Sequence, residues 1–365
     1  MKQLPERTIE RPFVRDKGID EELRTFIEKR KTQIKVVGCG GAGGNTVTRL
    51  MQVGIVGAQT VAINTDAQHL FYNTDADVKV LIGKKLTGGL GAGKNPKIGM
   101  EAAKESREDI KNTLRGSDMV FITCGLGGGT GGGSAPIVAD TAKKMGALTV
   151  AIVTMPFAME GKRIYENAME GLENLDGVTD TIIIIPNDKL LEIVPDVSLA
   201  TAFKVADEIL VNAVKGITEL VTKPGLVNVD FADVKAVMEA GGLSLIGMGE
   251  SDTENRAIES VERALNNPLI TVDINGATGA LINVMGGPDL TIKEAHQIVE
   301  TVCTNLSPDA KIIWGAKISK DIRDAVKTLV IVTGVKSPQI FGGEKTWSKE
   351  RKKDIEKILG VEFVG

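Results

Sequence analysis

The segment that decides the fold is CGLGGGTGGGSAP, Cys124–Pro136, in which seven of the nine residues from Gly125 to Gly133 are glycine. Glycine inside an ordered segment costs roughly 0.5–1 kcal/mol per residue relative to alanine, because more backbone freedom is lost on folding. The segment follows an apolar run typical of a buried strand and precedes a helical pattern. Glycine there lets an anion approach several backbone N–H groups, and the helix dipole adds attraction. We interpret it as a phosphate cradle made of backbone, because a flexible hinge seldom follows a hydrophobic strand with so many glycines.

The sequence around this segment repeats a strand, a glycine-rich loop and a helix. The expected strands are near-continuous apolar runs, which a parallel sheet covered on both faces requires. Helical patterns follow at 45–54, 97–114 and 135–146. This alternation predicts a doubly wound α/β domain over residues 34–198, with strands at 34–38, 60–66, 78–83, 118–125, 148–156 and 180–187.

The order of elements changes after residue 198. An apolar-periodic stretch, closed by Lys223-Pro224-Gly225, predicts a long central helix within residues 199–225. Residues 226–335 are predicted to form a second, α+β domain, with strands at 243–250, 279–287, 311–318 and 328–335 and helices at 255–267 and 291–306. Residues 1–33 are expected to be an extension with a short helix, and residues 336–365 a short polar tail.

Composition and charge exclude several classes of protein. The 365-residue chain has a net charge of −4, which argues against a broad basic surface for nucleic acid. No apolar run approaches the ~18 residues that span a bilayer, and the start lacks the apolar region of a secretory signal. The three cysteines are far apart, so neither disulfides nor a zinc site are expected. We interpret His69 and His296 as surface or filler residues, and we expect a cytoplasmic protein without metal ligands of its own.

Two further glycine loops follow predicted strands. GCGGAGGN, Gly38–Asn45, contains the G-x-G-x-x-G spacing of dinucleotide-binding proteins at Gly38, Gly40 and Gly43. The next strand ends in AINTD, with Asn64 near the place where such a protein needs an acidic residue and Asp66 slightly late. A Rossmann oxidoreductase is therefore the alternative reading, although no histidine is well placed to transfer a proton.

The other loop, TGGLGAGKN, nearly matches a Walker A motif. Asn95 stands where that motif needs Ser or Thr to reach magnesium, so we reject the P-loop interpretation. All three glycine loops follow strands of one predicted sheet, at the edge where open α/β sheets bind ligands. Three converging loops predict a triphosphate with its metal ion.

These loops and four other motifs occur in an order that resembles a known family. GLGGGTGGG is similar to the signature GGGTG[ST]G, and it is accompanied by GCGGAGGN, NTDAQ, GLGAGKNP, MPFAMEGKR, IPNDKLL and NVDFADV. Over about residues 34–335 the chain resembles the FtsZ family, the tubulin-like GTPases of prokaryotic cell division, and its sequence resembles archaeal members more than bacterial ones. The resemblance implies a GTPase that binds GTP and GDP, with Mg²⁺ held mainly by the phosphates, and that polymerises head-to-tail into filaments of the cytoplasmic division ring.

The resemblance also implies roles for individual residues. Contacts to the nucleotide are expected from Gly40, Gly41, Ala42, Gly43, Gly44, Asn45 and Asp66, to the γ-phosphate from Ala92, Gly93 and Asn95, and to the α- and β-phosphates from Gly128, Gly129, Thr130 and Gly131. Glu160 would bond the ribose, Asn187 and Asp207 would read guanine, and Phe203 would stack on it. The chain departs from the family at Gly132, usually Thr or Ser, at Lys94, often a small residue, and at Ile164, usually an arginine that Arg163 would have to replace.

The motif NVDFADV, residues 228–234, is expected to be catalytic. By resemblance, Asn228, Asp230 and Asp233 of one subunit would complete the site of a head-to-tail neighbour, where the two carboxylates polarise the attacking water. An unclosed head-to-tail contact generates a filament. Taken alone, the same motif is also an ordinary helix cap, and a scaffold that binds GTP with little turnover is a third reading.

The polar tail carries a small apolar end at Ile358–Val364. Bacterial members of the family often end in a peptide that binds membrane tethers. We therefore expect these residues to be a peptide that binds a membrane-tethering division protein.

Overall fold

The computed structural model describes residues 32–193, 199–223, 225–227, 229–239, 241–266, 274, 276–304, 306–319 and 322–335. The short helix expected near the N-terminus and the polar tail with Ile358–Val364 lie outside the described residues. The three cysteines are free thiols. Within the described part of the chain, no helix combines the length and the apolar character needed to cross a bilayer.

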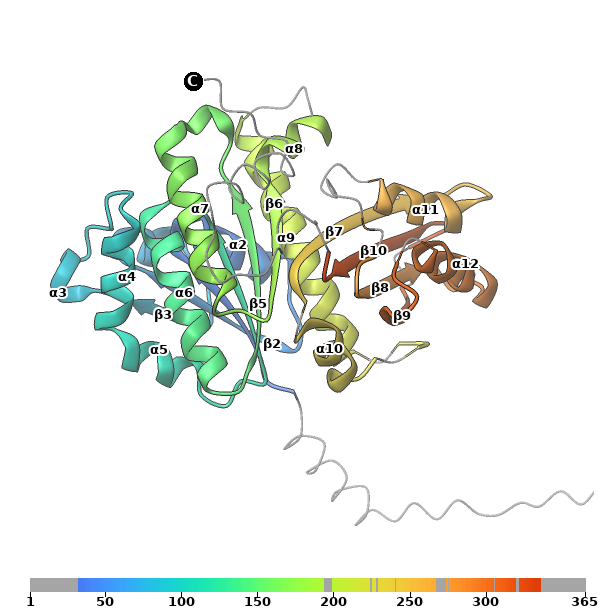
Figure 1. The fold of residues 1–365 in the computed structure, drawn as a ribbon, viewed down its shortest axis with the longest axis horizontal. Helices are drawn as coiled ribbons and strands as arrows, with labels where there is room; N and C mark the ends of the chain where they lie inside the picture. The colour runs from blue at the N-terminus through green and yellow to red at the C-terminus, as the bar shows by residue number, and fades with distance from the viewer. Residues whose placement is uncertain are drawn as a thin grey trace, which may run out of the picture. The chain divides into compact units, whose positions relative to one another are not determined.

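One ten-stranded sheet runs through the described chain, in the order β3-β2-β1-β4-β5-β6-β7-β10-β8-β9 (Figure 1). Strands β1 to β6 pair in parallel, and β10 lies antiparallel between β7 and β8. The strands are β1 (Ile34–Cys39), β2 (Ala58–Asn64), β3 (Val78–Leu81), β4 (Met119–Gly125), β5 (Leu148–Met155), β6 (Thr181–Pro186), β7 (Gly242–Ser251), β8 (Gly279–Gly286), β9 (Lys311–Ile318) and β10 (Val326–Thr333). The α/β fold class predicted from the sequence is confirmed.

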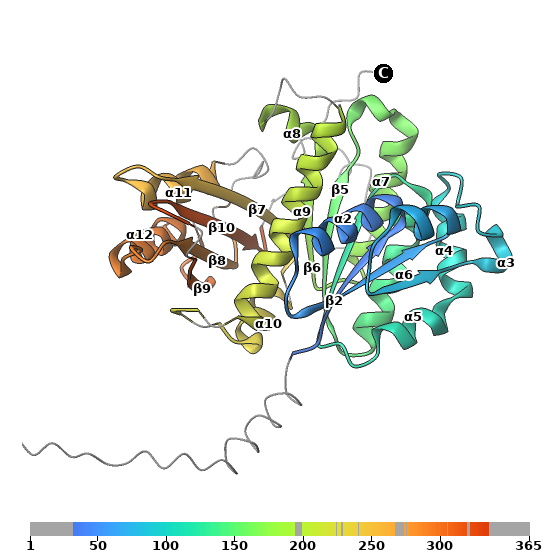
Figure 2. The same cartoon turned by 180° about the vertical axis from the view of Figure 1, so that it is seen from behind.

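Helices cover both faces of the parallel strands, as near-continuous apolar strands require. Figure 1 shows α4 (Pro96–Glu105), α5 (Arg107–Leu114), α6 (Gly129–Lys144) and α7 (Lys162–Asp176) on one face. The opposite view in Figure 2 shows α2 (Gly40–Val53) and the long helix α9 (Leu199–Thr222) on the other face. The shorter helices are η1 (His69–Asn73), α3 (Lys84–Thr87), η2 (Ala158–Glu160), α8 (Asn187–Ile193) and α10 (Phe231–Met238).

The single helix expected at 97–114 is two helices, α4 and α5. The break falls at Ser106, whose Oγ accepts a hydrogen bond of 3.0 Å from the backbone N–H of Gly83. Ser106 keeps backbone bonds of helical spacing on both sides, since its N–H donates to Ala102 O at 3.2 Å and its carbonyl accepts from Ile110 N–H at 3.1 Å. The bond from Gly83 is a tertiary contact at the break, and the helical pattern of the sequence does not contain it.

The two predicted domains share one sheet rather than having separate ones. Strand β6 pairs in parallel with β7 through three residue pairs, of which Thr181↔Gly242 is the first. Helix α9 packs on both parts, because its apolar face belongs to a cluster that includes Ile152 of β5 and Leu281 of β8. The division at residue 225 stays a prediction, since neither the sheet nor this core stops there.

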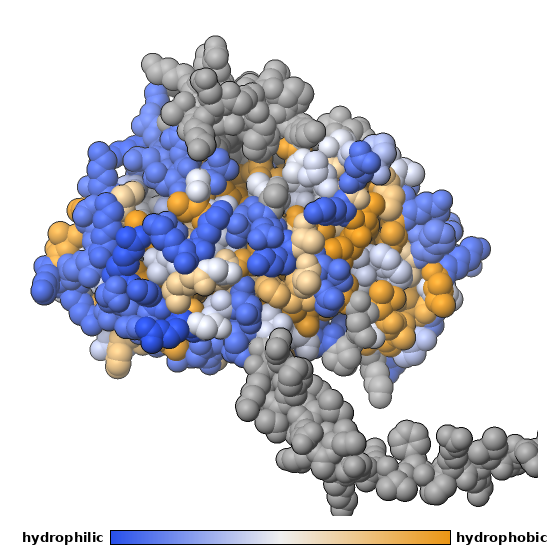
Figure 3. Space-filling view, turned by 60° about the horizontal axis from the view of Figure 1, so that its bottom comes forward, coloured by the Kyte–Doolittle hydropathy of each residue, from blue (hydrophilic) through white to orange (hydrophobic). Residues whose placement is uncertain are grey.

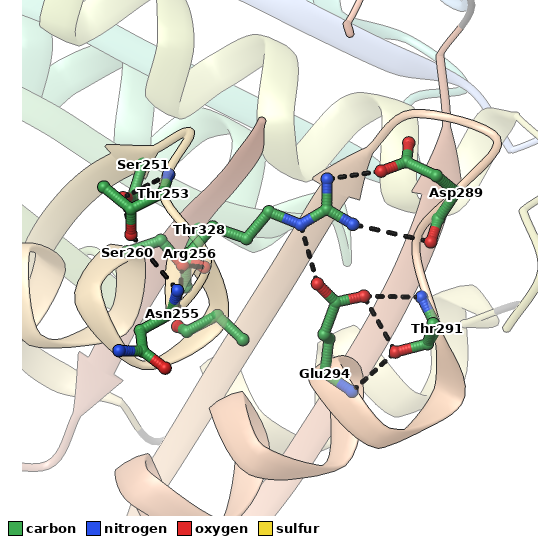
Figure 4. Close-up of polar contacts among 10 residues, drawn as sticks. Ser251, Thr253, Asn255, Arg256, Ser260, Asp289, Thr291, Glu294 and Thr328 are labelled. Carbon is green, nitrogen blue, oxygen red and sulfur yellow. Dashed lines mark hydrogen bonds and ion pairs between the residues drawn. The ribbon is translucent and has the colours of Figure 1, made fainter. Parts of the chain in front are cut away.

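A network of charges joins the two helices of the C-terminal region, α11 (Arg256–Leu265) and α12 (Ile292–Cys303). The Arg256 side chain, 12% exposed, lies between Asp289 and Glu294 (Figure 4). Its Nε donates to Glu294 Oε1 at 2.6 Å, while Glu294 also caps α12 together with Thr291. The hydrogen bond from Arg256 lowers the pKa of Glu294 to about 2. The network fixes the start of α11 against the start of α12.

Candidate functional site

A cleft of about 670 Å³ lies where the parallel strands end. This volume is within the range of pockets that bind small molecules and cofactors. The expected residues that line it are Gly41, Ala42, Asn45, Asp66, Ala92, Gly93, Gly128, Gly129, Thr130, Gly131, Glu160, Asn187, Phe203 and Asp207. The structure thus brings together residues from all three glycine loops and from α9.

One end of the cleft is built from the N-termini of two helices. Helix α6 begins at Gly129 and α2 at Gly40, and both first turns contribute lining residues. The first N–H groups of a helix have no partner inside the helix, and the dipole favours negative charge there. Thr130 and Thr65 join the start of α6 to the end of β2, with their Oγ1 atoms 2.6 Å apart. This end of the cleft suits an anion such as a polyphosphate.

The glycines of the opening segment serve packing as well as access. A Cβ at Gly129 would lie 2.7 Å from the backbone nitrogen of Asn95, and a Cβ at Gly133 would lie 2.1 Å from the carbonyl oxygen of Pro96. These contacts let α6 approach α4 at backbone distance. The phosphate cradle is therefore only part of the explanation for the glycine run, and close helix packing is the other part.

The other end of the cleft presents hydrogen-bond acceptors beside an aromatic ring. Among the described residues, the buried Oδ1 of Asn187 has no hydrogen-bond partner. Asp207 projects from α9 and accepts a hydrogen bond of 3.1 Å from Thr46. Burial raises the pKa of Asp207 to about 6, although the bond from Thr46 and the charge of Arg49 act to lower it.

The aromatic ring at this end is Phe203. It packs edge-on against Phe157, with the ring centroids 5.3 Å apart, and stays 41% exposed. Near the ring, the Glu160 carboxylate accepts a hydrogen bond of 2.9 Å from the backbone of Phe157. Phe203, Asn187 and Asp207 all line the cleft, so this end offers an aromatic ring and hydrogen-bond acceptors to a flat heterocycle with donor groups.

Three of the contact residues expected on α2 do not line the cleft. Gly40, Gly43 and Gly44 are absent from its lining. Gly40 has φ of +73°, and a Cβ there would lie 2.8 Å from the nitrogen of Gly131. A Cβ at Gly43 would lie 2.5 Å from the carbonyl oxygen of Thr123, and one at Gly44 would lie 3.1 Å from Thr74 Oγ1. These glycines let α2 pack closely on its neighbours. Their contacts with the nucleotide stay a prediction.

Asn95 and Arg163 also lie outside the lining of the cleft. Asn95 is the N-cap of α4, and its side chain accepts a hydrogen bond from Lys97. Arg163 is exposed at the start of α7. Ile164 packs on Gly127, where a Cβ would meet Ile164 Cγ2 at 2.7 Å. In this conformation Arg163 does not occupy the place of the missing ribose-contacting arginine.

His69, interpreted from the sequence as a surface or filler residue, lines the cleft. Its backbone N–H donates to Asp66 Oδ1 at 2.9 Å, and its ring lies against Gly41, 3.7 Å from where a Cβ would be. The motif NTDAQ, which His69 follows directly, was the available signal. Other lining residues that the sequence reasoning missed are Cys39, Asn64, Leu90, Gly91, Gly125, Leu126, Thr154, Pro156, Ala206 and Leu210.

The expected catalytic acids lie away from the cleft. Asp230 is the N-cap of α10, and its Oδ1 accepts a hydrogen bond of 2.8 Å from the backbone of Asp233. Both carboxylates are exposed and neither lines the cleft. Helix α10 lies at the opposite end of α9 from α8 (Figures 1 and 2). Asn228 lies outside the described residues.

A cleft with a polyphosphate end and a heterocycle end, at the carboxyl edge of a doubly wound sheet, defines a nucleotide-binding protein. Comparison with known proteins names the family. The model of the "Tubulin/FtsZ family, GTPase domain" matches residues 33–195, and that of the "FtsZ family, C-terminal domain" matches residues 242–336. The chain belongs to the FtsZ family and is a GTPase.

Similar proteins carry the same family name. The "Cell division protein FtsZ 1" of Methanocaldococcus jannaschii is 64% identical over 87% of this chain and 87% of its own length. The "Cell division protein FtsZ" of Methanothermobacter thermautotrophicus is 55% identical over 95% of this chain and 92% of its own length. A solved structure described as "FtsZ dimer, empty (M. jannaschii)" superposes with a TM-score of 0.84 at 63% identity, covering 90% of this chain and 94% of that one. The family predicted from the motifs is confirmed, and the oxidoreductase alternative is wrong.

Proposed function

We propose that this chain is the subunit of a GTP-hydrolysing filament that forms the cell-division ring in the cytoplasm. Its relatives are cell-division proteins by name, and a similar protein has been solved as a dimer. The observation that carries the proposal is the separation of the cleft from Asp230 and Asp233. A single subunit holds the nucleotide at one end and the acids at the other.

In the proposed complex, guanine lies at the end of the cleft formed by α8 and α9. The Asp207 carboxylate accepts from the N1–H and 2-amino groups of guanine, a donor pair that adenine lacks. Asn187 hydrogen-bonds the base through its Oδ1, which has no partner among the described residues, and Phe203 stacks on the ring. Glu160 contacts the ribose. The acceptors available here therefore select guanine over adenine.

The phosphates lie along the N-termini of α2 and α6. Gly41, Ala42 and Asn45 of α2 and Gly128–Gly131 at the start of α6 face the phosphate chain, and Ala92 and Gly93 reach its γ end. Since the donors are backbone N–H groups already fixed by their helices, little reorganisation is needed when charge develops in the transition state.

Magnesium is proposed to be bound mainly through the phosphates. Among the residues that the structure describes, no group of three or more His, Cys, Asp or Glu side chains could hold a metal ion. Mg²⁺ in nucleotide sites commonly binds substrate phosphates and only one or two carboxylates. Asp66, the one expected carboxylate near the phosphate loops, fits that sparse donor set. The ion supplies charge neutralisation on the phosphates.

In this proposal, α9 separates the cleft from Asp230 and Asp233 of the same chain, so hydrolysis requires the acids of a second subunit. At roughly 1.5 Å per residue, the helix from Asp207 to Thr222 spans about 22 Å. Asp230 and Asp233 follow beyond that end, so they cannot reach a γ-phosphate held in the cleft of their own chain. A head-to-tail neighbour brings its acids to the open cleft, where Asp230 and Asp233 orient the attacking water and Asn228 assists them.

The face that carries α10 exposes hydrophobic residues, as protein contact surfaces do. Figure 3 brings the lower end of Figure 1 forward and shows hydrophobic residues gathered over the C-terminal half of this face. Leu226, four residues before Asp230, is 67% exposed. Exposed apolar patches of this kind mark interaction sites. We propose that this face contacts the cleft end of the next subunit.

The test is GTP turnover per subunit as a function of protein concentration, with Mg²⁺ present and pelleted protein measured in parallel. We expect turnover near zero at low concentration and a rise with pelleting above a threshold. A flat turnover per subunit would show that one chain holds a complete site, and the proposal would be wrong. Pelleting with almost no hydrolysis would instead favour the scaffold reading.

The proposed partner at the membrane is a tethering division protein that binds the polar tail. Deletion of residues 350–365 should leave GTP turnover intact and abolish recruitment to the membrane. Unchanged recruitment of the shortened chain would contradict this part of the proposal.

A further inference from the structure

A partly buried cluster of charges lies where α9 ends. We call Glu219, Lys223 and Lys317 the Glu219 cluster. Glu219 is only 7% exposed, yet glutamate is almost never fully buried unless it is paired. Its Oε1 accepts at 2.7 Å from Nζ of Lys223, the residue that follows the end of α9, and its Oε2 accepts from Lys317 Nζ of β9. The cluster therefore ties the end of α9 to a strand of the C-terminal region.

The part of β9 next to Lys317 also binds the backbone of the segment that leads to Asp230 and Asp233. The backbone N–H of Leu226 donates to the carbonyl oxygen of Ala316 at 2.8 Å, and Val227 forms an isolated antiparallel bridge with Ala316. Ala316 is the neighbour of Lys317 in β9. The position of Lys317 and the position of Val227 are therefore set by one short piece of strand.

Close backbone approaches leave this segment little freedom. A Cβ at Gly225 would lie 2.6 Å from the carbonyl oxygen of Ala316, and a Cβ at Gly315 would lie 3.2 Å from Val229 Cγ2. The space shared by the Glu219 cluster, Gly225 and Val227 is a cavity of about 10 Å³. That is room for at most about one water molecule. A shift of β9 against α9 must therefore move Val227.

Glu219 remains charged in this setting. Burial alone would raise the pKa of Glu219, but the hydrogen bonds and charges of Lys223 and Lys317 outweigh burial and lower it. An ionised carboxylate shared by two ammonium groups is a strong and directional connection.

We propose that Glu219 is a positioning residue for GTP hydrolysis: by holding Lys317 against the end of α9, it fixes Val227 and so the direction in which Asp230 and Asp233 project toward the next subunit. The inference rests on the proposed function, in which these acids act on a neighbour's GTP. A displacement of about 1 Å in a catalytic group can cost roughly 10²-fold in rate. Glu219 itself touches neither nucleotide nor water in this scheme.

The experiment compares Glu219→Gln and Lys317→Met with Lys223→Met in the full chain. Lys223→Met is the matched control, because its bond to Glu219 joins residues four apart at the end of α9 and does not reach β9. We expect the first two variants to lower GTP turnover per polymerised subunit by about tenfold. The control should stay within about twofold of the wild type, and all three should keep the wild-type affinity of the unpolymerised chain for GTP.

A purely structural role makes a different set of predictions. It would lower the midpoint of thermal unfolding in Glu219→Gln and Lys317→Met while leaving turnover per polymerised subunit unchanged, and that result would overturn the inference. Should either single variant fail to fold, the charge exchange Glu219→Lys with Lys317→Glu keeps the connection. Turnover near the wild-type value in the exchanged chain supports the inference, and turnover as low as in a folded single variant contradicts it.

Failure of the proposed function is detected separately. Asp230→Ser removes a carboxylate of the proposed catalytic pair. If that variant hydrolysed GTP at the wild-type rate, the neighbour-completed site would be wrong, and the role of Glu219 with it. If Asp230→Ser were inactive but Glu219→Gln and Lys317→Met were fully active, only the inference about Glu219 would fail.

Discussion

Asp230 and Asp233 cap each other's backbone at the start of α10. Asp233 N–H donates to Asp230 Oδ1 at 2.8 Å, and Asp230 N–H lies 3.5 Å from Asp233 Oδ2. The pair forms a reciprocal capping box. The helix-cap reading of NVDFADV is thus confirmed for the isolated chain, while the catalytic role stays a proposal. Both roles fall on the same two side chains, so a useful experiment must separate them.

The first prediction separates capping from catalysis at Asp230. Asp230→Ser keeps an oxygen that can cap α10, so the free energy of unfolding should change by less than about 0.5 kcal/mol. GTP turnover in the polymer should fall by roughly 10²-fold or more, as loss of a residue that orients the nucleophile does. Asp230→Ala, which loses both functions, should lower the free energy of unfolding by a further ~1 kcal/mol. Chemical denaturation and a phosphate-release assay measure the two effects. Wild-type turnover in both variants would contradict the catalytic role.

The second prediction concerns pH and Asp207. The pKa of this carboxyl is raised to about 6 by burial. Its ionised form is the acceptor that guanine needs, so GTP affinity of the unpolymerised chain should be constant well above pH 6 and weaken as the pH falls below 6. Titrations of GTP binding between pH 5 and 8 test this. A pH-independent affinity would show that Asp207 does not bind the base.

The pH dependence that Asp207 gives to the stability of the fold has the opposite sign to the one it gives to GTP affinity. Its pKa in the folded chain lies above the unfolded value of about 3.9, so the protonated form stabilises the fold at low pH and this contribution is lost as the pH rises through 6. Asp207→Asn should therefore raise the midpoint of thermal unfolding at pH 7.5. It should also weaken GTP binding by roughly 10-fold or more, because a charge-assisted bond is lost, and improve binding of xanthosine triphosphate, whose 2-oxo group can accept from the new amide.

The third prediction uses two adjacent glycines of α6. A Cβ at Gly132 has the nitrogen of Gly127 as its nearest neighbour, at 3.9 Å, whereas a Cβ at Gly133 would lie 2.1 Å from Pro96 O. Gly132→Ser should raise the free energy of unfolding by up to about 0.5 kcal/mol through helix propensity. Its GTP affinity should change by less than about threefold, since Gly132 is not part of the cleft lining.

Gly133→Ser is the matched variant for that experiment. It adds the same side chain one residue later, and it should lower the free energy of unfolding by about 3 kcal/mol because α4 must move away from α6. If both substitutions changed the free energy of unfolding equally, the claim that Gly132 has room for a side chain and Gly133 does not would be wrong. A large loss of GTP affinity in Gly132→Ser would instead place that residue at the phosphates.

The fourth prediction concerns the Arg256 network. Arg256→Met leaves Asp289 and Glu294 without their shared cation, so the free energy of unfolding at pH 7 should fall by roughly 2–4 kcal/mol. Lys104→Met, which breaks the exposed pair with Glu101, should change it by less than about 1 kcal/mol. Denaturant unfolding of both variants gives the comparison, and equal losses would show that the network is no stronger than a surface pair.

The same network predicts a pH dependence of stability. The pKa of Glu294 is lowered to about 2 in the folded chain. Its contribution is therefore complete above the unfolded value of about 4.3 and is lost as the pH falls toward 2. Replacing Glu294 with Gln should flatten the dependence of the unfolding free energy on pH in that window. A Glu294→Gln variant with the wild-type slope would contradict this cause.

The parts of the fold that follow from local patterns were predictable. All ten strands lie within or close to apolar runs visible in the sequence, and α9 begins at Leu199 as expected. The three-pair joint between β6 and β7 was not predictable, because two strands separated by the whole of α9 carry no signal of their pairing. The contact of Ser106 with Gly83, 23 residues away in sequence, was not predictable for the same reason.

The residues of the candidate site were predictable where they belong to a sequence motif. Glycine runs marked the cleft correctly, yet they could not show which glycines face a ligand and which face another backbone, as Gly41 and Gly43 illustrate. The motif placed Asn95 at the γ-phosphate but did not show that its side chain caps α4. His69 was missed because a lone histidine is usually interpreted as filler, and only its place after Asp66 distinguishes it.

The sharing of α9 between two parts of the sheet has a consequence for synthesis on the ribosome. The face of β5 that packs on α9 includes Val150 and Ile152, both fully buried in the finished chain. Residues up to Ile193 can form the parallel strands, α2 and the helices of the other face, but the part of the sheet that α9 covers stays in contact with water until Thr222 has left the exit tunnel. A nascent chain that stalls after Ile193 but before Thr222 has emerged exposes this apolar sheet surface. We therefore expect chaperones to bind that nascent form longer than any other form of this protein.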